Sequence, residues 1–195
     1  MADNYNAILD YEEKFAKNLA FQLRAGRPQP AWHFFVPFKF LFEFFAAKRE
    51  VDQFAGEFLF LRKPALEGAR AAADSARQSK PAEIETAIRD RLTPNTPYAD
   101  EMFRRQAALA QLLLDHYSLL LNSTGRNYAS LVRHAYTSRA GYESFLRKLA
   151  AAENEIDRII LAIRGGSAEL QAQTALKQKA AHTLRTREAQ DIFKK

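Results

Sequence analysis

The sequence predicts an all-α protein: an antiparallel bundle of about five long helices and one short helix, with heptad-like aromatic and aliphatic seams. Apolar residues recur at steps of three and four along several long segments, the spacing that keeps one face of a helix apolar. Glycines and prolines gather between these segments, where helices should end. With 195 residues, 47% of them hydrophobic, the chain can bury a sizeable core.

The first helix is expected over residues 4–25, because four apolar residues lie on one side of it and Gly26 follows as a stop signal. These apolar residues are Ile8, Phe15, Leu19 and Leu23. Three further helices are expected downstream, a short one over residues 82–92 and long ones over residues 98–121 and 167–193.

The stretch WHFFVPFKFLFEFF, residues 32–45, holds seven of the fifteen phenylalanines and the only tryptophan. Its phenylalanines alternate with other residues like a half-buried strand, but no other segment offers a strand to pair with it. A heptad seam continues downstream through Phe40, Phe44, Ala47, Val51, Phe54, Phe58 and Leu61. We therefore expect a helix over about residues 37–63, which Pro64 ends or kinks before residues 65–78 continue helical.

A second seam runs from Tyr128 to Ile163 without a change of phase. It predicts one continuous helix of nearly forty residues. Gly141 and the pair Thr137 and Ser138 are the positions at which it could break, since glycine costs about 1 kcal/mol in a helix interior.

The chain is expected to divide into a helical bundle, residues 1–164, and a basic C-terminal helix, residues 165–195, packed on the bundle or extending from it. From Arg164 onward there are seven basic residues against three acidic ones. We expect Lys177, Lys179, Arg185 and Arg187 to contact an anionic partner. Nucleic acid is the less favoured partner, because this region has neither a helix-turn-helix signal nor aromatic residues for stacking on bases.

No catalytic residue, cofactor-binding residue or metal ligand is assigned, and no small-molecule substrate is indicated. The chain has no cysteine, and it lacks the motifs of serine hydrolases, P-loop proteins, zinc peptidases and dinucleotide-binding proteins. His116 lies on an apolar stripe and is interpreted as a core histidine with its hydrogen bonds satisfied. Glu12 and Glu153 fall in or beside apolar seams, which leaves open a carboxylate and histidine site in the core.

Glu153 and Asp157 are one helical turn apart and carry like charge. We interpret them as a solvated face that Arg158 and Lys148 balance.

The aromatic segment has more phenylalanines than one seam can hide. We expect its surplus to contact a partner or a membrane: Trp32, Phe34, Phe35, Phe38, Phe42 and Phe45. Exposed aromatic groups of this size are a liability unless they are covered. The cover could be the chain's own helices, another protein subunit or a membrane surface.

These observations favour a noncatalytic helical scaffold or adaptor, which attaches to a protein partner or to itself through the Phe-rich element. The first alternative is a peripheral protein at an anionic membrane surface. A less favoured alternative is an enzyme with a carboxylate and histidine site in the bundle core. The N-terminal residues show no apolar core of signal-peptide length, so we expect a cytoplasmic location, with the inner face of a membrane as a variant.

Overall fold

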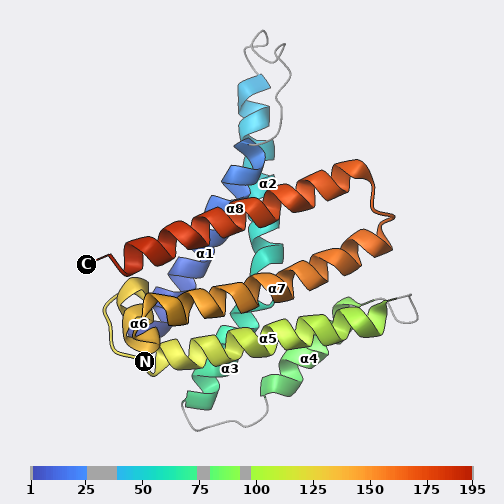
Figure 1. Cartoon of the computed structure of the whole chain (residues 1–195). Helices are drawn as coiled ribbons and strands as arrows, with labels where there is room; N and C mark the ends of the chain where they lie inside the picture. The colour runs from blue at the N-terminus through green and yellow to red at the C-terminus, as the bar shows by residue number, and fades with distance from the viewer. Residues whose placement is uncertain (1, 26–38, 74–79, 93–97, 195) are drawn as a thin grey trace.

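The computed structural model describes residues 2–25, 39–73, 80–92 and 98–194, and every regular element within them is a helix. The predicted all-α class is therefore confirmed. Figure 1 shows the helices, which are α1 Ala2–Ala25, α2 Lys39–Leu59, α3 Arg62–Ala73, α4 Lys80–Arg91, α5 Ala99–Leu121, α6 Tyr128–Tyr136, α7 Arg139–Ile163 and α8 Ala168–Ile192.

The long helices do not share one axis direction. α5, α7 and α8 run across the pair formed by α1 and α2, and α7 and α8 lie antiparallel to each other (Figure 1). α3 packs along α5, and the short α6 lies between α5 and α7. The expected antiparallel bundle of five long helices is thus not confirmed in detail.

Among the side chains that the structure describes, the main hydrophobic core draws on every helix except α2. Tyr117, Leu113, Leu131 and Tyr142 are fully buried at its centre. A second cluster joins Phe15 and Leu19 of α1 to the small residues Ala180 and Ala181 of α8, with Phe54 and Phe58 of α2 packed against it. α8 therefore contributes to both clusters. None of the described helices combines the length and the apolar character needed to cross a membrane.

The helix expected over residues 37–63 ends earlier than predicted. α2 stops at Leu59, and the chain turns at Phe60 and Leu61 before α3 begins. Pro64 explains the turn, because its ring would clash with the carbonyl of Phe60 in a continuous helix. In the first turn of α3 the missing N–H of Pro64 costs little.

The single helix expected from Tyr128 to Ile163 is wrong, because α6 and α7 are separate. Thr137 adopts the left-handed conformation with φ 54°, which ends α6. Ser138 then caps α7, its hydroxyl accepting a hydrogen bond from the backbone N–H of Gly141 at 3.2 Å. The apolar seam continues across this break, since Tyr128, Leu131, Tyr142, Phe145 and Leu149 are all buried.

Candidate functional site

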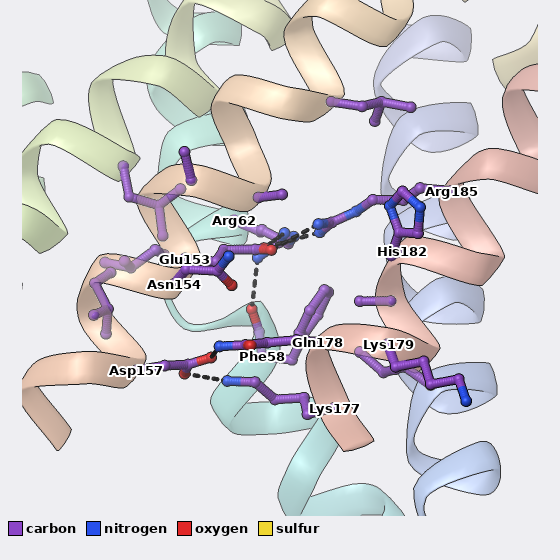
Figure 2. A pocket seen from close by; sticks show the side chains of 18 of the residues that line it. Phe58, Arg62, Glu153, Asn154, Asp157, Lys177, Gln178, Lys179, His182 and Arg185 are labelled. Atoms are coloured by element: carbon purple, nitrogen blue, oxygen red, sulfur yellow. Dashed lines mark hydrogen bonds and ion pairs between the residues drawn. The ribbon is translucent and has the colours of Figure 1, made fainter. Parts of the chain in front are cut away.

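A cavity of about 1120 Å³ lies between α7 and α8, with the end of α2 and the start of α3 among its walls (Figure 2). We call it the α7–α8 groove. Apolar side chains cover much of its surface, among them Phe54, Phe58, Leu146, Ile156 and Ile160. Phe54 and Phe58 belong to the heptad seam of the Phe-rich segment, so the described end of that segment contributes to the groove.

The polar part of the groove is an ion-pair cluster centred on Glu153 of α7. Arg185 of α8 holds both carboxylate oxygens, with Nη1 2.6 Å from Oε2 and Nη2 2.9 Å from Oε1. Arg62 of α3 donates from Nη2 to Oε1 at 2.7 Å (Figure 2). One carboxylate therefore ties three helices together through two buried guanidinium groups.

Arg62 extends the cluster to α1 and α5. Its Nε lies 3.0 Å from Oε2 of Glu12, and the other oxygen of Glu12 accepts from the hydroxyl of Tyr117 at 2.7 Å. The guanidinium of Arg62 also lies over the ring of Phe58, 3.8 Å from its centroid. Two arginines and two glutamates thus balance in charge, as burial of ions requires.

The protonation of Glu153 follows from these contacts. Burial opposes its ionisation, but the charges and hydrogen bonds of Arg185 and then Arg62 outweigh burial and lower the pKa to about 2. Glu153 is therefore an anion fixed between its partners. It is not poised to exchange a proton near neutral pH.

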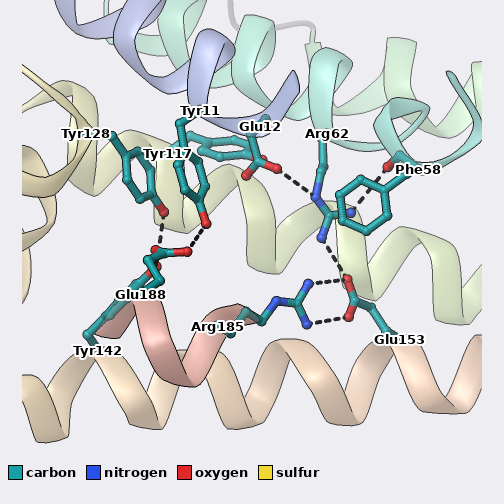
Figure 3. Close-up of polar contacts among 10 residues, drawn as sticks. All are labelled: Tyr11, Glu12, Phe58, Arg62, Tyr117, Tyr128, Tyr142, Glu153, Arg185 and Glu188. Atoms are coloured by element: carbon teal, nitrogen blue, oxygen red, sulfur yellow. Dashed lines mark hydrogen bonds and ion pairs between the residues drawn. The ribbon is translucent and has the colours of Figure 1, made fainter. Parts of the chain in front are cut away.

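A tyrosine cluster holds a further carboxylate of this interior, Glu188 of α8 (Figure 3). Tyr142 donates to Oε1 of Glu188 at 2.6 Å, and Tyr11 donates to Oε2. The hydroxyl of Tyr128 lies 3.1 Å from that of Tyr142, and the rings of Tyr11 and Tyr128 stack with centroids 3.5 Å apart. These contacts link α1, α6 and α7 to the C-terminal half of α8.

Glu188 has no ion-pair partner among residues 2–25, 39–73, 80–92 and 98–194. Burial raises its pKa to about 7, although the hydrogen bonds from Tyr11 and Tyr142 act in the opposite direction. Unlike Glu153, it changes protonation near neutral pH.

His116 is a core histidine with a satisfied ring nitrogen, as predicted. Its side chain is 4% exposed, Nδ1 lies 2.7 Å from the hydroxyl of Tyr136, and the ring stacks on Phe145. Burial, and then the charge of Arg62, lower its pKa to about 3. The histidine therefore stays neutral over the physiological range.

The carboxylate and histidine site left open by the sequence is not assembled. Glu12 and Glu153 share Arg62, whereas His116 turns to Tyr136. No group of three potential metal-ligating side chains occurs in the part of the chain that the structure describes.

The four basic residues of α8 that were expected to contact an anionic partner differ from one another in exposure and in pairing. Arg185 is 6% exposed and bound to Glu153, so its guanidinium lies in the interior of the protein. Lys177 pairs with Asp157, to which Gln178 also donates at 3.2 Å. Lys179 and Arg187 are exposed.

The interpretation of Glu153 and Asp157 as a solvated face is also wrong. Asp157 is 5% exposed, and both carboxylates pair with α8. Their partners are Lys177 and Arg185, not the neighbours Arg158 and Lys148 on the same helix.

The expected contact residues of the Phe-rich element are only partly covered by the structure. Trp32, Phe34, Phe35 and Phe38 lie outside the described residues. Phe42 and Phe45 belong to α2, but their side chains also lie outside the description.

Sequence reasoning missed Arg62, Tyr11 and Glu188 as members of the buried networks. Their places beside the apolar seams could have indicated this. Arg62 directly follows Leu61, the last residue of the first seam, and Tyr142, which donates to Glu188, belongs to the second seam. Polar residues in such places need partners if they are buried.

Comparison of the chain with known protein families, curated proteins and solved structures finds no match.

Replacing Glu153 by alanine should destabilise the fold by about 3 to 5 kcal/mol, because two buried guanidinium groups lose their shared carboxylate. Glu155→Ala is the control: Glu155 pairs with Arg158 near the surface, and its loss should cost less than about 1 kcal/mol. Urea unfolding followed by circular dichroism measures both. Equal costs for the two variants would contradict the role given to Glu153.

Glu188 should make the protein less stable as pH rises from 4.5 to about 7, since the folded state keeps a proton that the unfolded state releases in this window. We therefore compare the free energies of unfolding of the wild type and of Glu188→Gln. The wild-type value minus the variant value should fall by up to about 3 kcal/mol over this pH window, because each unit of pKa shift corresponds to about 1.4 kcal/mol. His116 has the opposite slope but is present in both proteins, so it cancels.

Urea titrations at a series of pH values give this difference, with Glu169→Gln on the exposed start of α8 as control. If the free energies of unfolding of the wild type and of Glu188→Gln differ by the same amount at every pH from 4.5 to about 7, Glu188 does not keep a proton in the folded state.

Proposed function

We propose that the protein is a noncatalytic helical adaptor that holds an amphipathic helix of a protein partner, or of a second copy, in the α7–α8 groove. The observation that carries the proposal is the groove itself. Its volume of about 1120 Å³ exceeds the roughly 300 to 1,000 Å³ typical of small-molecule pockets. A helix laid into an apolar groove is a recurrent mode of peptide recognition.

The walls of the groove suit such a partner. α7 contributes Leu146, Ile156 and Ile160, and α2 contributes Phe54 and Phe58, so apolar side chains approach from two directions. Aromatic residues in particular supply binding energy at protein interfaces. Small residues, Ala150, Ala151 and Ala181, leave room between these larger side chains.

The paired state of the ionisable groups supports a binding role over catalysis. Arg62, Glu153 and Arg185 satisfy one another, and Asp157 is held by Lys177 and Gln178. A catalytic acid or base needs a pKa near the working pH and access to substrate. Glu153 has neither property, because its pKa is about 2 and its oxygens are occupied.

The Phe-rich element extends this proposal toward the N-terminal end of α2. Phe54 and Phe58 line the groove, and the predicted seam to which they belong begins at Phe40, inside the segment 32–45. Trp32, Phe34, Phe35, Phe38, Phe42 and Phe45 are therefore proposed as additional contacts to the partner or to a second copy.

Filling the groove should block binding without unfolding the protein. Ala151 is exposed and lines the groove, so Ala151→Trp places a large ring where the partner helix would lie. The probe is a fluorescein-labelled helical peptide of about 16 residues, spanning about 24 Å, with a leucine stripe and equal numbers of lysine and glutamate. Fluorescence anisotropy should show binding to the wild type and at least tenfold weaker binding to Ala151→Trp, about 1.4 kcal/mol.

Ala108→Trp is the matched control, because Ala108 is exposed on α5 and does not line the groove. This variant should bind the peptide as the wild type does. Failure of the wild type to bind, or equal weakening by both tryptophans, would contradict the groove as the binding site.

Trp32 reports on the Phe-rich element, since it is the only tryptophan. If this element forms a contact between copies of the chain, fluorescence emission should move to the red on dilution as the contact opens. The double substitution Phe38→Asp with Phe42→Asp should then give a folded monomer. A blue shift with anionic vesicles that salt weakens would favour the membrane-surface alternative. Emission unchanged by dilution and vesicles, with unfolding by the double substitution, would assign these phenylalanines to the core.

A further inference from the structure

We infer that the α7–α8 groove selects an acidic amphipathic helix, with carboxylates flanking its apolar stripe. This inference rests on the proposed function and adds the charge of the partner to it. It follows from how the charged side chains of the groove are partnered.

The groove is lined by four carboxylates and five cations. The carboxylates are Glu57, Glu143, Glu153 and Asp157, and the cations are Arg62, Arg147, Lys177, Lys179 and Arg185.

Three of the four carboxylates are already engaged by cations of the chain. Glu153 is held by Arg62 and Arg185, and Asp157 by Lys177. Glu143 accepts a hydrogen bond from Nε of Arg139 at 2.7 Å. Glu57 also has an interaction partner. Most of the negative charge of the groove is therefore neutralised within the chain and does not attract a basic partner.

Two cations of the groove, by contrast, have no partner for their charge among the described residues. Arg147 of α7 and Lys179 of α8 are exposed, and neither the guanidinium of Arg147 nor the ammonium of Lys179 forms an ion pair or hydrogen bond with any residue that the structure describes. Figure 2 shows Lys179 on α8, away from the Glu153 cluster. The two residues belong to different helices, so each wall of the groove has one unpaired positive charge.

This placement matches the geometry of an amphipathic helix. Such a helix presents its apolar stripe to the groove and directs the residues on both sides of the stripe toward the two walls. Carboxylates in those positions would meet Arg147 on one side and Lys179 on the other. Lysines there would meet like charge, which disfavours the wrong partner and slows its association.

The apolar walls argue against nucleic acid as the anionic occupant. Phosphate binding is carried by cations that follow a backbone, with stacking on aromatic side chains. Here Phe54 and Phe58 are half-buried and packed against Phe15 and Leu19. An apolar stripe with acidic edges fits the groove better than a polyanion does.

The test uses the full-length protein and three labelled peptides with the same length and leucine stripe. They differ only in the residues that flank the stripe: glutamate, a balanced mixture, or lysine. In fluorescence anisotropy the acidic peptide should bind at least tenfold tighter than the basic one, and raising the salt concentration should reduce this ratio.

The double variant Arg147→Glu with Lys179→Glu should abolish or reverse the preference and leave binding of the balanced peptide within about twofold, or roughly 0.4 kcal/mol. Its control is Arg104→Glu with Lys148→Glu, which changes net charge equally at exposed positions that do not line the groove. The control should keep the preference for the acidic peptide.

The outcomes separate the two proposals. If the balanced peptide binds but acidic and basic peptides bind equally, the charge inference fails and the adaptor proposal stands. If the control variant loses the preference for the acidic peptide as the groove variant does, that preference depends on the net charge of the protein and not on the groove. The charge inference then also fails. If no peptide binds, the adaptor proposal itself fails.

Discussion

The arrangement of the helices depends on the burial of Glu153 between Arg62 and Arg185. A buried carboxylate is tolerated only where opposite charge and hydrogen bonds replace its water. Glu153 meets this condition through Arg62 of α3 and Arg185 of α8, and Arg62 links the cluster to α1 through Glu12. Because the bidentate contact with Arg185 has a fixed geometry, it sets the register of α8 on α7.

The groove follows from how α8 is attached. Its buried residues begin at Ala180 and continue to Ile192, so the C-terminal half packs on the core. The preceding half is exposed or half-buried, and α7 ends likewise with Ile163 exposed. Small residues in the packed half, Ala180, Ala181 and Ala189, allow close approach, while Lys177 and Asp157 tie the two helices farther along. The space left between the two helices is lined on α8 from Lys177 to Ala189 and is apolar over much of its surface.

The sequence predicted the helices well because their apolar periodicity is local. Continuity across Thr137 and Ser138 was favoured for the same reason: the turn there keeps the seam in phase, so periodicity alone does not show that the possible break at this pair is a real one. The partners of Glu153 were missed because Arg62 and Arg185 are 91 and 32 residues away. No spacing rule within one helix predicts a pairing that forms only after three helices pack. The burial of His116 was predicted correctly, because the apolar stripe that indicates it, Leu109, Leu113 and Leu120, lies on the same helix.

The central claim is that the ion-pair cluster makes α8 an integral part of the fold, so that the groove has two firm walls. Hydrogen exchange of backbone amides, followed by mass spectrometry under native conditions, tests it most directly. Amides over residues 180–192 should exchange as slowly as those of the buried part of α5, because both then open only by global unfolding. Exchange of α8 far faster than α5 would show that α8 detaches on its own, and would contradict this account of the cluster and of the groove.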